Sequence, residues 1–166
     1  MGHEDPKLTH LDERGRARMV DVGDKPVTRR VARARAHVTM SQAALRGVQS
    51  GTLVKGDVLA VARLAGIQAA KQTSQLIPLC HVLGLDHVDV DVRVDTQRRC
   101  VAIGSRVTCR ASTGAEMEAI VAVSIAAATV YDMCKAVDRE MTIGGIQLLE
   151  KSGGRSGTWK RSEETR

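Results

Sequence analysis

The sequence predicts an α+β fold, a ferredoxin-like sandwich in which helices cover one face of an antiparallel sheet. Residues 29–40 alternate between small apolar side chains and basic or polar ones, as in a strand with one buried face. Residues 88–95 alternate valine with charged side chains and give the clearest strand pattern in the chain. From residue 29 the order is strand, helices, strand, strand, helix, strand, which is the β-α-β-β-α-β plan of this fold.

Two helices are expected after the first strand. Ser41 can cap a short helix that ends within residues 47–51, where glycines occur. Asp57 can cap the next helix, because apolar side chains recur at helical spacing after it. This second helix is predicted to run over residues 58–76 and to end before Pro78, which cannot continue a helix.

The second half of the chain completes the plan. A turn at residues 96–98 joins the valine-rich strand to a strand over residues 99–109. A long helix then begins near Ala115, and because it is apolar almost all round we expect it to be buried. Gly144 and Gly145 are predicted to separate this helix from a last strand over residues 146–149.

Length and composition favour one domain, the ferredoxin-like one, over residues 16–157, with a flexible N-terminal segment (1–15) and a flexible C-terminal tail (158–166). Apolar residues make up 43% of the chain, with one Trp, one Tyr and no Phe. The core must therefore be aliphatic. Alanine-rich helices present flat apolar faces, which favours an oligomer.

The charge balance limits the partners. A net charge of +6 and a pI near 9.5 favour an anionic partner, which could be a nucleic acid, an acidic membrane or a phosphorylated small molecule. The alternative is a solvated surface with a basic tail, which would explain part of the excess charge. Because aromatic side chains are nearly absent, the stacking that single-stranded nucleic acids need is missing, and no nucleic-acid partner is expected. No apolar run free of charge reaches membrane-spanning length and no signal peptide opens the chain, so we expect a cytoplasmic protein with no membrane partner.

The four cysteines have no metal or redox spacing, so they are interpreted as buried thiols. Cys80 and His81 are adjacent, which leaves open a catalytic thiolate as the lesser alternative. A lone histidine such as His81 is more often structural than catalytic.

The long helix carries the strongest indications of chemistry. Asp132 and Lys135 are three residues apart, so they share a helix face. Their neighbours are apolar, and a lysine in apolar surroundings has a lowered pKa suited to general acid or base catalysis. The alternative is a surface ion pair of little energetic weight.

The start of the same helix carries two acids. Glu116 fits a capping box that starts at Thr113, in which its side chain would reach back to the cap amide. Glu118 lies on another face of the helix and has no capping role, although it could simply be solvated.

Two further segments are candidates for anion binding. Lys55 lies just before a helix start, where phosphates are bound favourably, although a solvated loop lysine is the default interpretation. Residues 151–157 combine glycines with Lys151 and Arg155 and could form an anion cradle, but they lack P-loop spacing. A flexible basic tail would look the same.

Six segments occur in an order and spacing that resemble the MoaC family, the cyclic pyranopterin monophosphate synthases of molybdenum-cofactor biosynthesis. The resemblance covers residues 8–157, and the six segments are Lys55–Val58, Ala65–Lys71, Ile77–His81, Glu116–Ala119, Tyr131–Ala136 and Lys151–Gly154.

The resemblance implies a ferredoxin-like fold and a homohexamer, a trimer of dimers with active sites at the dimer interface. It implies a phosphorus–oxygen lyase that converts 3′,8-cyclo-7,8-dihydroguanosine 5′-triphosphate to cyclic pyranopterin monophosphate with release of pyrophosphate. No cofactor and no metal ligands are implied. Whether Mg²⁺ accompanies the triphosphate stays open.

The resemblance also assigns residues. The catalytic residues it implies are Lys55, His81, Glu116, Glu118, Asp132 and Lys135. The substrate-binding residues it implies are Arg30, Arg33, Leu79, Cys80, His81, Met117, Glu118 and Lys151. In this hypothesis Lys55 and Lys135 act as acid/base groups, Asp132 orients and tunes Lys135, and His81 and the glutamates position the base and transfer protons. The rivals are a non-catalytic nucleotide-binding module and an RNA-binding ferredoxin-like domain.

Overall fold

A computed structural model describes residues 14–162 of the chain. Its strands and helices follow the predicted order, with an additional short helix and an additional short strand. The elements are β1 (Thr28–Thr39), α1 (Gln42–Ser50), α2 (Val58–Lys71), α3 (Thr73–Leu76), β2 (Leu85–Asp95), β3 (Cys100–Ala111), α4 (Glu116–Cys134), β4 (Thr142–Ser152) and β5 (Trp159–Lys160).

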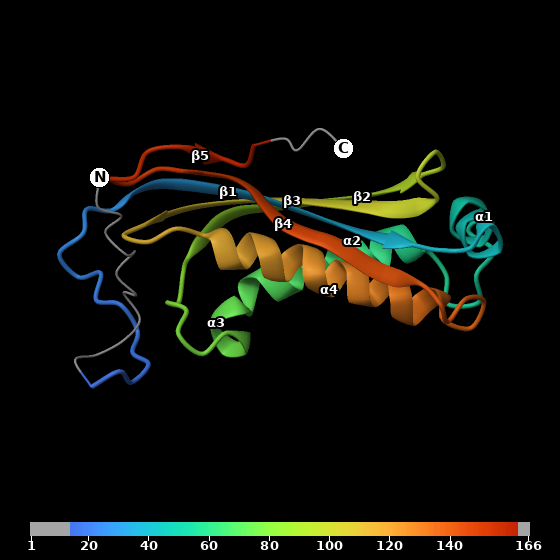
Figure 1. The fold of residues 1–166 in the computed structure, drawn as a ribbon, viewed down its shortest axis with the longest axis horizontal. Helices are drawn as coiled ribbons and strands as arrows, with labels where there is room; N and C mark the ends of the chain where they lie inside the picture. Colours follow the sequence, from blue (N-terminus) through green and yellow to red (C-terminus); the bar gives the residue numbers. More distant parts are fainter. Residues whose placement is uncertain (1–13, 163–166) are drawn as a thin grey trace, which may run out of the picture.

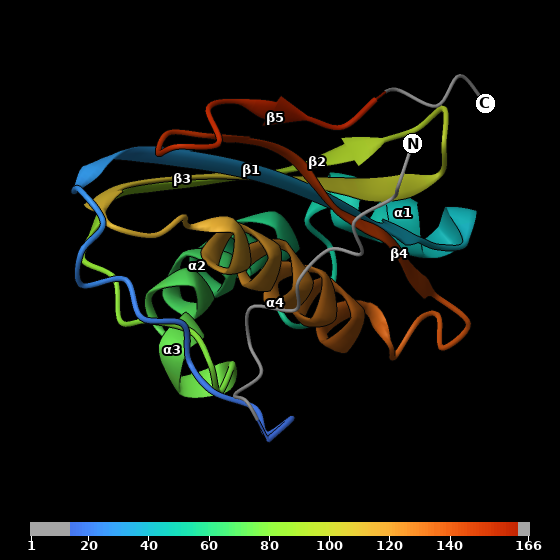
Figure 2. The same cartoon turned by 60° about the vertical axis from the view of Figure 1, so that its left-hand side comes forward.

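The strands form one sheet in the order β2-β3-β1-β4-β5, and every neighbouring pair is antiparallel. Helices α2 and α4 lie side by side under one face of this sheet, and α1 lies at one end (Figures 1 and 2). The opposite face carries no helix in the part of the chain that the structure describes. The predicted α+β sandwich is therefore confirmed.

Local sequence explains how the two layers meet. In β1 the alanines at 32, 34 and 36 and Val38 are buried against the helices, as the alternation predicts. Both predicted caps are confirmed, since Ser41 accepts from the amide of Ala44 and Asp57 accepts from that of Ala60. Gly66 lets α2 approach α4, because a Cβ there would lie 2.9 Å from the Ala122 carbonyl oxygen.

Two predictions about element boundaries differ clearly from the structure. Helix α2 ends at Lys71, and residues 73–76 form the separate helix α3. Gly144 and Gly145 lie inside β4 and do not precede it. They coincide with a register shift against β1, and Gly145 has a φ of +60°, so the glycines permit an irregular strand where a break was predicted.

The two ends of the chain were predicted to be flexible segments. Trp159 and Lys160 lie in the segment assigned to the C-terminal tail, and they pair with β4 as the edge strand β5. Most of the predicted N-terminal segment (1–15) lies outside the described residues.

Helix α4 is the central element of the core. Among the described residues it is the one helix long and apolar enough to cross a membrane, by length and composition alone. However, 56% of its most hydropathic window is buried inside the structure, and it packs on both α2 and the sheet. Its composition is therefore explained by burial in the core, as predicted.

Candidate active site

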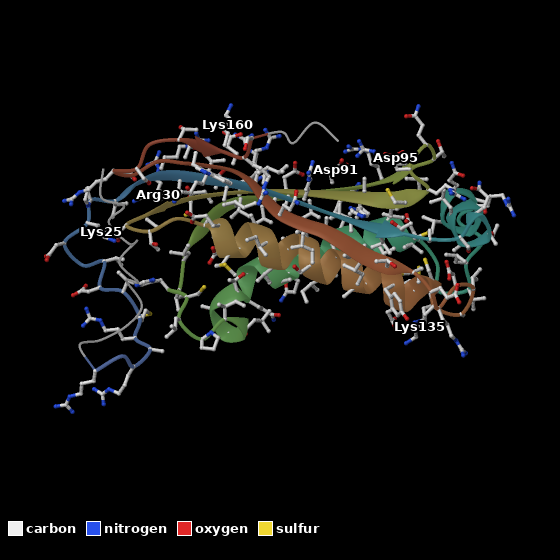
Figure 3. The ribbon with its side chains drawn as sticks, in the orientation of Figure 1. Lys25, Arg30, Asp91, Asp95, Lys135 and Lys160 are labelled. Carbon is white, nitrogen blue, oxygen red and sulfur yellow. The ribbon has the colours of Figure 1, made fainter. Side chains whose placement is uncertain are left out.

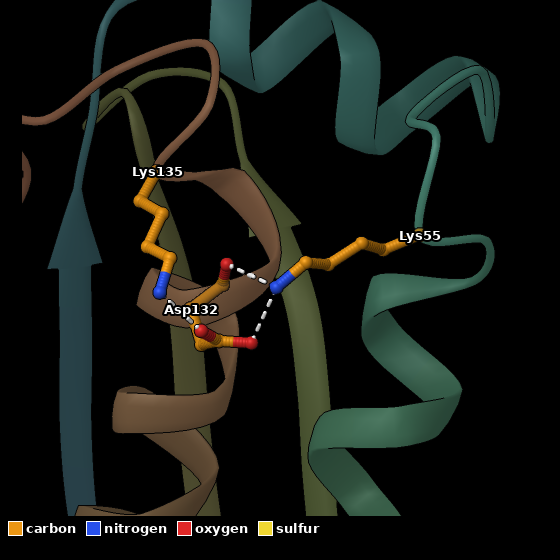
Figure 4. Close-up of polar contacts among 3 residues, drawn as sticks. All are labelled: Lys55, Asp132 and Lys135. Carbon is orange, nitrogen blue, oxygen red and sulfur yellow. Dashed lines mark hydrogen bonds and ion pairs between the residues drawn. The ribbon is translucent and has the colours of Figure 1, made fainter.

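One cluster of charges lies at the C-terminal end of α4 and consists of Lys55, Asp132 and Lys135 (Figure 4). The Lys55 Nζ donates to Asp132 Oδ2 at 2.6 Å and to the Asp132 carbonyl oxygen at 3.0 Å. The Lys135 Nζ lies 2.7 Å from the other carboxylate oxygen, Oδ1. Lys55 comes from the loop before α2, so the fold joins residues 77 positions apart. We call these three residues the lysine–aspartate cluster.

Pairing fixes the protonation states of this cluster. Hydrogen bonds from Lys135 and then Lys55 lower the pKa of Asp132 to about 2. The same contact raises the pKa of Lys135, because Asp132 stabilises the ammonium form. The lowered lysine pKa predicted from the apolar neighbours is therefore wrong in this chain. Both side chains are about half exposed, at 53% and 54%, so the ammonium is not desolvated.

A second group of charges lies at the N-terminal end of α4 and lines a cavity of about 290 Å³. Glu116 Oε1 and Lys151 Nζ are 3.1 Å apart across this cavity. We call it the glycine-edged cavity, and its lining includes Lys25, Arg30, Glu116, Lys151, Gly153, Gly154 and Arg155. The capping-box prediction is wrong, because the N-cap of α4 is Ala115 and no side chain caps it. Glu116 is thus available to Lys151.

The shape of the cavity depends on Arg30 and two glycines. Arg30 donates to the carbonyls of Ala111 (3.2 Å) and Ser112 (3.1 Å), which holds the guanidinium at the C-terminal end of β3. Gly153 and Gly154 have φ values of +101° and +74°. A Cβ at Gly154 would overlap the Arg30 guanidinium, so glycine is required here both for backbone conformation and for space.

Glu118, two residues after Glu116 on α4, is buried, with 4% of its surface exposed. The alternative that it is solvated is therefore wrong. Burial raises its pKa, and the neighbouring charge of Glu116 raises it further. Burial and then Glu118 also raise the pKa of the Cys80 thiol, which disfavours the thiolate that nucleophilic catalysis would need.

The remaining predicted site residues do not line the glycine-edged cavity. His81 is partly buried, and its Nε2 lies 2.9 Å from the Val20 carbonyl oxygen. Leu79 and Met117 are also partly buried. Arg33 lies on the opposite face of the sheet from Arg30, where it is 3.9 Å from Glu150, so a single chain does not bring these two arginines together.

The cavity is also lined by residues that the sequence did not predict as site residues. Lys25, Ser112 and Ser156 line it. Ser156 belongs to the glycine-rich segment that the sequence flagged as an anion cradle, whereas Lys25 lies in a polar stretch that carries no motif. Among residues 14–162, no three His, Cys, Asp or Glu side chains are grouped to hold a metal ion.

The two groups of charges lie far apart within one chain. Figure 3 shows Lys25 and Arg30 at one end of the molecule and Lys135 at the other. At 1.5 Å per residue, the helix between Glu116 and Asp132 spans about 24 Å. The lysine–aspartate cluster and the glycine-edged cavity of one chain are therefore too far apart to contact the same small molecule.

Comparison with known proteins identifies the family. A sequence model of the MoaC family matches residues 19–154. The chain is 61% identical over 158 residues to the cyclic pyranopterin monophosphate synthase of Thermomicrobium roseum, covering 95% of each chain. It is 58% identical to the synthase of Chloroflexus aggregans, again over 95% of each. It is 59% identical to cyclic pyranopterin monophosphate synthase 1 of Mycobacterium tuberculosis, covering 93% of this chain and 91% of that one. The chain belongs to the MoaC family.

Proposed function

We propose that this enzyme of molybdenum-cofactor biosynthesis converts 3′,8-cyclo-7,8-dihydroguanosine 5′-triphosphate to cyclic pyranopterin monophosphate and pyrophosphate. The observation that supports it best is the division of charges between the two ends of α4. Opening the purine imidazole part and rebuilding it as a pterin requires several proton transfers, and the lysine–aspartate cluster supplies exchangeable protons. Attack on the α-phosphate requires charge neutralisation, which the glycine-edged cavity supplies.

Within this proposal the two lysines differ from Asp132 in role. Asp132 accepts hydrogen bonds from Lys55 and Lys135 and remains ionised, so it orients both ammonium groups. Because the pKa of Lys135 is raised, this lysine starts the reaction as an acid and donates a proton to the substrate. The conjugate amine then acts as a base in a later transfer.

The cavity would bind the triphosphate. Arg30 and Lys151 line it together with Lys25 and Arg155, and arginine forks match phosphate oxygens. Glu118, whose pKa is raised by burial, would position the base moiety and transfer protons together with Glu116 and His81. Four cations neutralise much of a triphosphate, so the proposal requires no protein-bound metal; Mg²⁺ would arrive with the nucleotide if it takes part.

The lysine–aspartate cluster and the glycine-edged cavity are about 24 Å apart in one chain, and we call them the two half-sites. We propose that each active site combines the lysine–aspartate cluster of one copy with the glycine-edged cavity of another. Exposed apolar side chains on the helix layer support contact between copies, with Val61 42% and Leu64 66% exposed on α2. The assembly proposed is a homohexamer of three dimers, in the cytoplasm, where its free cysteines stay reduced.

The direct test is incubation of the purified protein with the cyclised triphosphate. We expect stoichiometric release of pyrophosphate and a pterin product. Binding of the nucleotide without pyrophosphate release would instead identify a non-catalytic nucleotide-binding module.

Subunit mixing tests the shared site. Lys135→Ala disables one half-site and Lys151→Ala the other, so each variant alone should be inactive. Random exchange makes about half of the dimers mixed, and in each mixed dimer one of two sites is intact. We expect recovery of roughly a quarter of wild-type turnover. No recovery, with exchange verified by mass spectrometry of differently tagged chains, would contradict a site shared between copies.

A further inference from the structure

A second basic hollow lies on the face of the sheet that no described helix covers. It has a volume of about 510 Å³ and is lined by Arg29, Asp86, His87, Arg106, Thr108 and Arg110. These residues come from β1, β2 and β3, whereas the glycine-edged cavity lies at the end of α4. We call it the arginine hollow. None of its six residues belongs to the proposed active site.

The three arginines of the arginine hollow outnumber its one carboxylate, Asp86. Arg29 and Arg110 are direct cross-strand partners in the β1–β3 register, and like charges at such positions destabilise a sheet. Among residues 14–162, none of the three arginines of the hollow forms an ion pair with an acidic side chain. Other exposed arginines of the same face have partners: Arg33 lies near Glu150, and Arg93 pairs with Asp91.

The backbone also concentrates side chains there. The β2–β3 register shifts between Leu85 and His87, which leaves Asp86 as an extra residue in β2. Consecutive strand residues normally point to opposite faces, but this bulge directs both Asp86 and His87 toward the hollow. Thr108, which is 7% exposed, adds a hydroxyl donor at the base.

We propose that the arginine hollow is a binding site for a small anion that carries two or more phosphate groups. Three guanidinium forks present donors in the geometry that phosphate oxygens accept bidentately. The volume is within the range of small-molecule sites and exceeds what a single phosphate fills. No aromatic side chain lines the hollow, so recognition rests on the phosphates and not on stacking of a base. Bound phosphate would relieve the repulsion between Arg29 and Arg110.

The test is calorimetric titration of inorganic tripolyphosphate at matched ionic strength into the full-length protein. The informative variant is Arg106→Gln/Arg110→Gln. The matched control is Arg35→Gln/Arg93→Gln, which removes the same charge from the same sheet face outside the hollow. We expect the informative variant to lose one binding site per chain, with affinity there reduced about a hundredfold. The control should titrate like the wild type, and turnover should be unchanged in both.

A second variant tests whether the ligand of the hollow is an anion. Asp86→Asn removes a carboxylate that repels phosphate, so tripolyphosphate should bind more tightly to it. Weaker binding to Asp86→Asn would overturn the proposal. So would an Arg106→Gln/Arg110→Gln variant that titrates like the wild type. A changed molecular mass of that variant in light scattering would also overturn it, because the arginines would then serve contacts between copies.

Discussion

Helix α4 carries one carboxyl group near each end, and opposite causes shift the pKa values of the two groups. At the C-terminal end, Asp132 is half exposed and is held ionised by two hydrogen-bonded lysines. At the N-terminal end, Glu118 is buried and its pKa is raised by the loss of water. The first arrangement keeps charged groups ready to donate protons at neutral pH, whereas the second favours the protonated form of a carboxyl group. One helix thus carries two carboxylates whose pKa values are pushed apart, as a sequence of proton transfers requires.

The largest expected effect is at the C-terminal end. Lys135→Ala removes the proposed acid and should lower turnover about 10²- to 10⁴-fold. The side chain is exposed, so folding should be little affected, as circular dichroism and thermal melting can verify. Lys71→Ala is the matched control, since Lys71 is an exposed lysine in the last turn of α2. Near-normal turnover of Lys135→Ala would remove this lysine from the mechanism.

Asp132→Asn tests whether pairing sets the protonation state of Lys135. The carboxylate raises the lysine pKa, so its removal lowers that pKa. The alkaline limb of the kcat/KM profile, where the acid loses its proton, should move to lower pH in the variant. We expect turnover to fall about tenfold or more, because the ammonium also loses its orientation. An unmoved alkaline limb would assign it to another group.

At the N-terminal end, Gly154→Ala should act on substrate binding. The new Cβ overlaps the Arg30 guanidinium, so that side chain must leave its place in the cavity. We expect KM for the triphosphate to rise about tenfold, as for loss of one charge-assisted contact. Gly157→Ala is the control: its φ is +63° and nothing lies within 4 Å, so it shares the backbone strain without the collision. Equal KM values for the two variants would show that Arg30 does not bind substrate.

Much of the fold was predictable because its signals are local. Alternation in β1 and β2, the caps Ser41 and Asp57, and the apolar length of α4 each depend on neighbours in sequence. Errors arose where distant contacts decide. Gly144 and Gly145 were predicted to break the chain, but pairing with β1 carries β4 through them as an irregular strand. Glu116 fits a capping box, but Lys151 on β4 pairs with it instead.

The candidate site was predictable in its residues more than in its arrangement. The spacing of Asp132 and Lys135 predicted their contact, whereas the approach of Lys55 depends on how α2 packs against α4. Val130, Met133 and Cys134 are buried in the core while the Lys135 side chain is exposed to solvent, so the predicted desolvation fails. The sequence placed the two glutamates at the start of α4 and Asp132 and Lys135 further along it, but it could not show that Arg30 and Lys151 lie beside Glu116.

The smallest expected effect is on stability, from Glu118→Gln. Below pH 4.5, the ordinary pKa of the group, the carboxyl is protonated in both folded and unfolded chains, so variant and wild type should be equally stable. As pH rises, the unfolded chain releases this proton more readily than the folded one, because burial raises the folded pKa. The wild type therefore loses stability with rising pH, while the uncharged glutamine does not.

At pH 8 the Glu118→Gln variant should accordingly be the more stable protein, by about 1 kcal/mol, the low end of the cost of burying a polar group. Urea unfolding of both proteins at pH 4 and pH 8 measures this. Glu140→Gln, at an exposed position, should show no such growth of the difference with pH. A wild type that is more stable than Glu118→Gln at pH 8 would mean that the buried carboxylate is stabilised by contacts as an anion, and the contrast between the two ends of α4 would fail.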